Sequence, residues 1–97
     1  MRLRFTSRAR ADLEEIASYL RPLSSRGASN VQAAILASLD DLLDFPRIGR
    51  LQTGASVRKL VVRKYPYLIY YNINDDAAEI VVISIRHAAR QRDFSDQ

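Results

Sequence analysis

The pattern of apolar and polar positions is clearest over residues 57–87, where three apolar runs are separated by two short turns. The runs cover residues 60–62, 68–73 and 80–85, and they are rich in the β-branched and aromatic residues that favour a pleated strand. The turns, at 64–67 and 74–76, are too short for a parallel crossover, which needs about a dozen residues. The pattern therefore predicts a three-stranded antiparallel meander.

Two segments ahead of the meander carry apolar residues at three- and four-residue spacing, the period of an amphipathic helix. The first predicted helix follows Thr6 or Ser7, whose hydroxyl can cap it, and is ended or kinked at Pro22. The second begins at Ser29, which has capping-box spacing to the glutamine three residues later, and ends at Pro46. The apolar stripes are Ala9, Leu13, Ile16, Ala17 and Leu20 in the first helix and Val31, Ile35, Leu39 and Leu42 in the second.

Alternation of polar and apolar residues at positions 2–5 predicts one more strand, which must pair with an edge of the meander. Residues 23–29 and 47–56 are expected to be a turn and a loop. In the last strand, strict alternation places Val81, Ile83, Ile85 and His87 on one face. Both sheet faces carry apolar groups, so one should pack on the helices and the other should form a groove or a partner site. The sequence thus predicts an α+β fold of order β-α-α-β-β-β, with a helical hairpin packed on one face of a small antiparallel sheet.

Composition narrows the classes of function. At 97 residues the chain is expected to be a single domain, with 88–97 as a tail that is either a short helix or disordered. It has no cysteine and one histidine, so neither a disulfide framework nor a metal site is expected. No apolar run approaches the length of a membrane span, and the amino terminus lacks the apolar core of a signal peptide. The expected location is the cytoplasm, without membrane contact.

The net charge of +4 and the pI of about 9.9 suit an acidic partner or nucleic acid. Locally, Arg58, Lys59, Arg63 and Lys64 lie close together without an acid between them. Such a cluster could bind phosphate beside the neighbouring tyrosines, or simply keep a sheet edge soluble. An acidic amphipathic or extended peptide could also cover the leftover apolar surface, and by physical argument alone this protein-binding interpretation ranks narrowly first.

A ribonuclease is the catalytic alternative. His87 ends the last strand next to Arg86, while Tyr70 and Arg58 lie on the two preceding strands. Such a set could move the proton of a 2′-hydroxyl and hold a phosphate as charge develops. An isolated histidine at a strand end is more often structural, and strand tyrosines usually serve packing. No phosphate-binding glycine loop and no nucleophile elbow are present.

Four motifs, in this order, resemble the ParE branch of the ParE/RelE toxin superfamily: FTSRARADLEEIASYL, LLDFPRIGR, VRKLVVRKYPYLIYYNI and IVVISIRHAAR. They span residues 5–90, nearly the whole chain. Each is modestly specific alone, and their order and spacing are specific together. The family often has proline in the first turn of helix one, where this chain has Ser7.

The resemblance implies the toxin of a bacterial type II toxin–antitoxin module, with no cofactor. A cognate antitoxin would wrap an acidic, amphipathic carboxyl-terminal region around the helices and sheet, giving a toxin–antitoxin hetero-oligomer. ParE-like members inhibit DNA gyrase, whereas RelE-like members are ribosome-dependent mRNA endoribonucleases. The YPY hairpin, the HAAR ending and a tail without tyrosine favour gyrase inhibition over RNA cleavage.

Site residues follow from these alternatives. A gyrase inhibitor needs no catalytic residue, and the expected target or partner surface comprises Arg58, Lys59, Arg63, Tyr65, Tyr67, Tyr71, Arg86 and Arg90. If the chain is instead a nuclease, the catalytic candidates are Arg58, Tyr70, Arg86 and His87.

Overall fold

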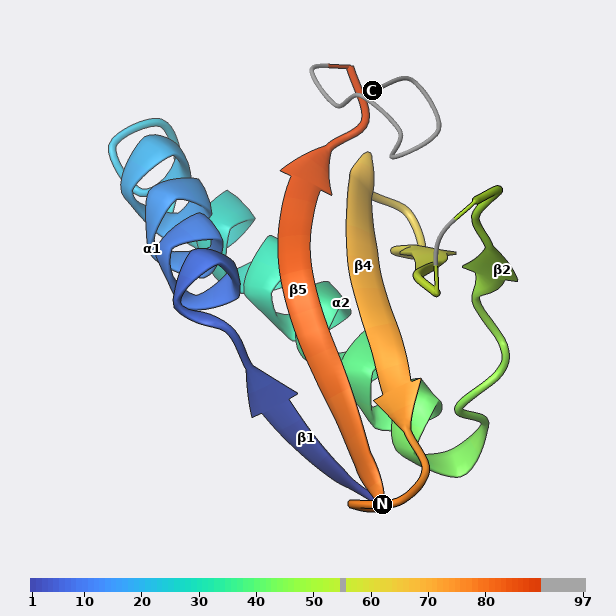
Figure 1. The fold of residues 1–97 in the computed structure, drawn as a ribbon. Coiled ribbons are helices and arrows are strands. Elements are labelled where there is room, and N and C mark those ends of the chain that lie inside the picture. The colour runs from blue at the N-terminus through green and yellow to red at the C-terminus, as the bar shows by residue number, and fades with distance from the viewer. Residues whose placement is uncertain (55, 90–97) are drawn as a thin grey trace.

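Five strands form one sheet in the order β1-β5-β4-β3-β2, and two helices pack against it in a computed structural model that describes residues 1–54 and 56–89. The elements along the chain are β1 (Arg2–Phe5), α1 (Ser7–Leu20), α2 (Ser25–Asp44), β2 (Arg50–Leu51), β3 (Arg58–Val61), β4 (Tyr67–Asn74) and β5 (Glu79–His87). In Figure 1, α2 lies behind β4 and β5, and α1 lies alongside β5. The predicted α+β architecture with a helical hairpin is confirmed.

Two features of the sheet differ from the prediction. β1 pairs with the edge of the meander as expected, but it runs parallel to β5, so the sheet is mixed rather than antiparallel. Because more than seventy residues separate these strands, no short turn dictates their relative direction. The predicted loop 47–56 also contains the two-residue strand β2, which extends the sheet beyond β3.

The meander β3-β4-β5 is confirmed, but a bulge changes which residues of β5 share a face. Tyr70 is opposite Ser84 while Tyr71 is opposite Val82, so Ile83 has no partner on β4. An unpaired residue of this kind reverses the alternation beyond it. Ile85 therefore lies on the helix-facing side together with Val82. Strict alternation had instead predicted that Ile85 shares its face with Ile83.

Side chains from the start of the chain cover the part of the β5 edge that β1 does not reach. The Thr6 hydroxyl donates to the carbonyl of Ile83 at 2.7 Å, and the N–H of Ile85 donates to the Asp12 carboxylate at 2.9 Å. Asp12 also forms an ion pair with Arg8 one helical turn away. These contacts satisfy backbone groups that an open strand edge would expose, and they fix α1 against the sheet.

The helix starts follow the capping rule, with one correction. Thr6 caps α1 as predicted, because its hydroxyl accepts from the N–H of Ala9 at 3.0 Å. The second helix begins at Ser25 rather than Ser29: Ser24 is its cap and accepts from the N–H of Gly27 at 2.9 Å. Both serines are suitable caps by residue type, and the earlier one adds a full turn to the helix.

The predicted apolar stripes form the core between helices and sheet. Ala9, Val31, Ile35, Leu39 and Leu42 are buried against Val62, Tyr67, Ile69, Tyr71, Ile80, Val82 and Ile85. Among the described residues, no helix combines the length and apolar character needed to cross a bilayer. The predicted tail, 88–97, lies outside the described residues except for Ala88 and Ala89.

Candidate interaction surfaces

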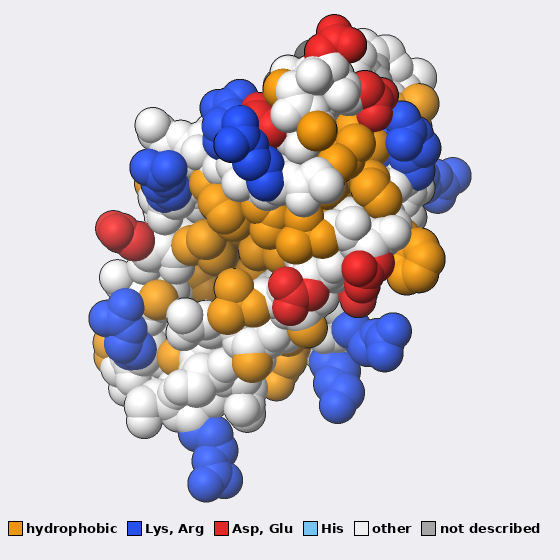
Figure 2. Space-filling model, turned by 90° about the horizontal axis from the view of Figure 1, so that it is seen from below, with side chains coloured by type: hydrophobic (Ala, Val, Ile, Leu, Met, Phe, Trp, Pro, Cys, Tyr) orange, Lys and Arg blue, Asp and Glu red, His pale blue; other side chains and the backbone are white. Residues whose placement is uncertain are grey.

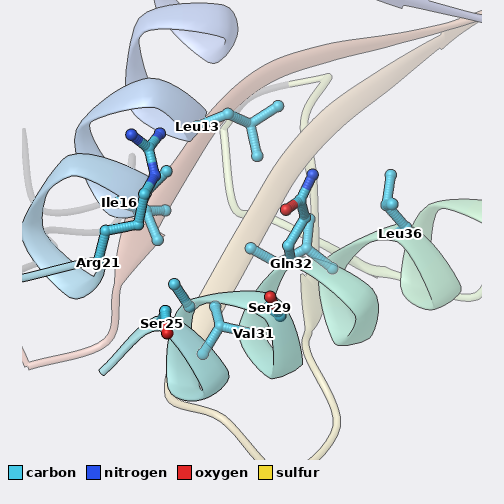
Figure 3. Close-up of a pocket in the computed structure, with 11 residues that line it drawn as sticks. Leu13, Ile16, Arg21, Ser25, Ser29, Val31, Gln32 and Leu36 are labelled. Carbon is cyan, nitrogen blue, oxygen red and sulfur yellow. The ribbon is translucent and has the colours of Figure 1, made fainter. Parts of the chain in front are cut away.

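An apolar groove lies between the two helices where they diverge from the turn that joins them (Figure 3). Its volume is about 310 Å³, and its lining comes from both helices: Leu13, Ile16, Ala17, Arg21, Ser25, Ala28, Ser29, Val31, Gln32, Ile35 and Leu36. Leu13 and Ile16 extend from α1 toward α2 in Figure 3, while Leu36 reaches upward from α2. The groove thus has an apolar floor and a few polar groups at its margin.

Leu36 marks the exposed end of this groove. Its side chain is 53% exposed, whereas Leu39, one turn further along the same helix, is 2% exposed in the core. A view from below shows hydrophobic side chains gathered around a hollow, with both basic and acidic side chains around it (Figure 2). An apolar hollow of this kind is a surface on which an amphipathic segment can dock.

A second surface forms at the other end of α2, where residues 45–50 are fixed by hydrogen bonds from the sheet. The N–H of Gly49 donates to the Tyr71 hydroxyl at 2.8 Å, and that hydroxyl donates to the carbonyl of Pro46 at 2.8 Å. The Arg58 guanidinium donates to the carbonyls of Gly49 at 2.9 Å and of Arg47 at 3.3 Å. We call this set of contacts the clasp; it fixes the backbone of the loop at four points.

Packing inside the clasp is close. A Cβ atom at Gly49 would lie 2.6 Å from the Tyr71 hydroxyl oxygen and 2.7 Å from its Cε1, so no larger residue fits without displacing the ring. Burial raises the pKa of the Tyr71 hydroxyl, while the hydrogen bond from Gly49 and the charge of Arg58 act in the opposite direction. The hydroxyl therefore stays protonated and keeps donating to Pro46 throughout the physiological pH range.

The four nuclease candidates lie on both faces of the sheet. Arg58 is opposite Tyr71, and His87 is opposite Tyr67, so both lie on the helix-facing side. His87 accepts from the N–H of Ala89 at 3.1 Å, and its ring meets that of Tyr67 edge-on, with centroids 5.3 Å apart.

On the other face, the Arg86 guanidinium lies 5.4 Å from the ring centre of Tyr70, which is 0% exposed. These two residues are a basic and aromatic pair, while the sheet separates them from Arg58 and His87. The structure therefore brings together only Arg86 and Tyr70, whereas Arg58 and His87 share the other face but lie on different strands, opposite Tyr71 and Tyr67.

The expected target or partner surface is also divided. Tyr67 and Tyr71 lie in the core, and Arg58 belongs to the clasp. Lys59 and Arg86 lie on the face away from the helices, while Arg63 and Tyr65 lie in the turn between β3 and β4. Arg90 lies outside the described residues. Within 1–54 and 56–89, no group of three or more His, Asp or Glu residues is arranged to hold a metal ion.

Sequence reasoning missed both ends of α2 as sites. Leu36 follows Ile35 directly and does not belong to the predicted apolar stripe of the second helix. An apolar residue outside the stripe could have predicted that the helix exposes an apolar side chain there, as the structure shows. The sequence indicated the clasp more weakly, because Pro46 and Gly49 only predict a short loop. No sequence pattern identifies the distant Tyr71 as the residue that forms hydrogen bonds with this loop.

Comparison with solved structures first defines the class of fold. The chain matches a structure of the chromosomal ParDE toxin–antitoxin system from P. aeruginosa with a TM-score of 0.76 and 23% identity, over 90% of this chain and 95% of that one. It matches the toxin–antitoxin complex RelBE from E. coli with a TM-score of 0.59 and 27% identity, over 93% and 96% of the two chains. The fold is therefore that of the ParE/RelE toxins.

Sequence comparison then gives the family. The model of the ParE toxin of the type II toxin–antitoxin system parDE matches residues 3–92. A putative toxin, Y4kP, of Sinorhizobium fredii is 34% identical over 93% of this chain and 91% of its own length. Toxin RelE2 of Caulobacter vibrioides is 41% identical over 89% of this chain and 93% of its own. The chain belongs to the ParE toxin family of type II toxin–antitoxin systems, which confirms the resemblance seen in its motifs.

Proposed function

We propose that this toxin acts by binding DNA gyrase and inhibiting it, and that an antitoxin neutralises it by occupying the groove between α1 and α2. The family and the ParDE fold match support the first part. The observation that carries it is the division of the nuclease candidates, with Arg58 and His87 on one face and Tyr70 and Arg86 on the other. General acid–base chemistry needs its groups within hydrogen-bond reach of one substrate atom, and a sheet between them prevents this.

Ribosome-dependent mRNA cleavage is the second candidate. It is favoured by the 41% identical relative named toxin RelE2 and by the pairing of Arg86 with Tyr70 on one face. An arginine can hold a phosphate of the RNA backbone. In this alternative, Arg86 carries the contact with RNA, Tyr70, which is 0% exposed, only packs beside it, and His87 takes no part.

Two assays separate these candidates. Purified toxin is added to DNA gyrase in a supercoiling assay and, in parallel, to ribosomes carrying a defined mRNA. We expect supercoiling to be inhibited while the mRNA stays intact. Cleaved mRNA together with normal supercoiling would support the RelE-like alternative instead. The variant His87→Ala should inhibit gyrase as the wild type does, because its side chain makes only internal contacts among the described residues.

The antitoxin site rests on the groove and on the net charge of the chain. An acidic amphipathic helix suits it, since apolar residues can fill the hollow (Figure 2) while carboxylates complement the net charge of +4. Leu36→Asp should weaken binding of the antitoxin encoded beside the toxin at least tenfold. Leu23→Asp, a change at an exposed leucine outside the groove lining, is the matched control and should bind normally. Equal affinity of the two variants would place the antitoxin elsewhere.

A further inference from the structure

The clasp presents two large apolar side chains to solvent. Phe45 is 64% exposed and Ile48 is 52% exposed, and both belong to the loop 45–50. A flexible loop would let such side chains fold back against the protein, but four hydrogen bonds fix the backbone between and around them. The fixed backbone means that a partner binding here has little loop entropy to overcome. Rigid, exposed apolar anchors of this kind are typical of interface centres.

The charge beside these anchors indicates the chemistry of the partner. Arg50 is the last residue of the loop, is exposed, and pairs with Lys59 where β2 meets β3. Within the described part of the chain, Arg50 forms no ion pair. Carboxylates brought by a partner can pair with its guanidinium, whereas a basic partner would be repelled by it.

This surface shares no lining residue with the groove. The lining residues of α2 fall between Ser25 and Leu36, whereas the loop begins after Asp44, where the helix ends. Nine residues separate Leu36 from Phe45, which corresponds to about 14 Å along a helix. A ligand in one does not need to cover the other.

We propose that loop 45–50 together with Arg50 is the surface by which the toxin contacts its target, a protein that offers an apolar socket bordered by carboxylates. Phe45 and Ile48 fill the socket and Arg50 pairs with its acidic border. Tyr71 and Arg58 act as positioning residues that fix the loop, rather than as direct contacts. The inference rests on the proposed function in one respect, that the toxin acts by binding a protein, and it holds for gyrase or for another protein target.

Growth arrest in a bacterial host without antitoxin tests this assignment. The variants Ile48→Ser and Arg50→Glu should each need at least tenfold more inducer to arrest growth, at matched protein levels. The controls Leu23→Ser and Arg26→Glu change exposed residues of the same kind away from the loop and should arrest growth as the wild type does. Because all four side chains are exposed, the purified variants should keep the wild-type unfolding temperature.

The conservative change Arg50→Lys keeps the charge and should restore most of the potency that Arg50→Glu loses. A purely structural role of Arg50 would instead appear as a lower unfolding temperature of the Glu variant.

Three results would overturn the proposal, and they are distinguishable. If the wild type arrests growth and both loop variants arrest it equally well, the loop is not the target surface, while the proposed function stands. If the wild type does not arrest growth at all, the proposed function fails and the inference with it. If sedimentation shows a wild-type dimer that Ile48→Ser converts to a monomer, the surface joins two copies of this chain instead.

Discussion

The two ends of α2 expose apolar residues in different ways. Over its amino-terminal part the helix diverges from α1 around a groove, and Leu36 is 53% exposed there (Figure 3). At its carboxyl-terminal end the chain enters a loop that Tyr71 and Arg58 fix from the sheet, with Ile48 displayed on it. One surface is a groove that a ligand can fill, and the other is a loop whose backbone is fixed by hydrogen bonds within the chain. This difference is the basis of the proposal that the two surfaces take two separate partners.

The largest expected effect separates the core side of α2 from its groove side. Leu39→Asp places a charge at a position that is 2% exposed, and it should destabilise the domain by about 4 kcal/mol or more, enough to unfold it. Leu36→Asp, three residues earlier and 53% exposed, should leave the stability within about 0.5 kcal/mol of the wild type. Urea unfolding followed by circular dichroism measures both. A folded, soluble Leu39→Asp protein would show that the core is assigned wrongly.

The second effect breaks the clasp by overpacking. Gly49→Ala introduces a Cβ 2.6 Å from the Tyr71 hydroxyl oxygen, and it should cost about 3 kcal/mol. Gly54→Ala is the matched control: nothing lies near its Cβ, and only its φ of 74° opposes a side chain, at a cost of about 1 kcal/mol. The comparison uses free energies of unfolding in urea. If the control were the more damaging change, the clasp would contribute nothing to stability.

The third effect removes the clasp hydroxyl alone. Tyr71→Phe leaves the Gly49 N–H and the Pro46 carbonyl without their partner and should destabilise the domain by about 1–3 kcal/mol. Tyr19→Phe, at an exposed tyrosine, should change stability little.

The same variant has a predictable pH dependence. The pKa of Tyr71 is raised on folding, so above about pH 10 the unfolded chain releases a proton that the folded chain retains. The stability that this hydroxyl contributes is therefore complete below pH 10 and falls as the pH rises further. Chemical unfolding between pH 8 and 11 should show a steeper loss for the wild type than for Tyr71→Phe. Parallel curves would contradict the burial of this hydroxyl.

The smallest effect loosens one wall of the groove. Asp12→Ala removes the acceptor for the Ile85 N–H at the β5 edge and the partner of Arg8, and it should cost about 1 kcal/mol. Glu14→Ala, an exposed acid in the same helix, is the control and should be neutral. Amide hydrogen exchange of Ile85 gives a local readout, since it should accelerate in the Asp12 variant and not in the control.

Local patterns in the sequence predicted most of the fold. The helical stripes and the three apolar runs were sufficient for the helices and the meander, because each reflects a period within one element. The bulge at Ile83 was not predictable in this way. The carbonyl of Ile83 itself accepts from the Thr6 hydroxyl and the N–H of Ile85 donates to Asp12, both more than seventy residues earlier. The parallel direction of β1 was likewise undetermined by any local turn.

The sites were harder to predict because charge and residue type do not reveal partners. The basic cluster suggested that Arg58 belongs to a binding surface, yet its guanidinium donates to the carbonyls of Gly49 and Arg47. Tyr71 was expected on the same surface and is instead buried at the centre of the clasp. Both residues support a surface formed by neighbours that the sequence did not single out, Phe45 and Ile48.

The central claim is that the two ends of α2 serve different partners, and one measurement tests it most directly. Growth is followed in cells that express the toxin, as wild type or as Leu36→Asp, together with the antitoxin encoded beside it. The account predicts that the antitoxin rescues cells with the wild-type toxin and fails to rescue those with Leu36→Asp, which remains fully toxic. A Leu36→Asp protein that is folded but no longer toxic would contradict the separation of the two surfaces.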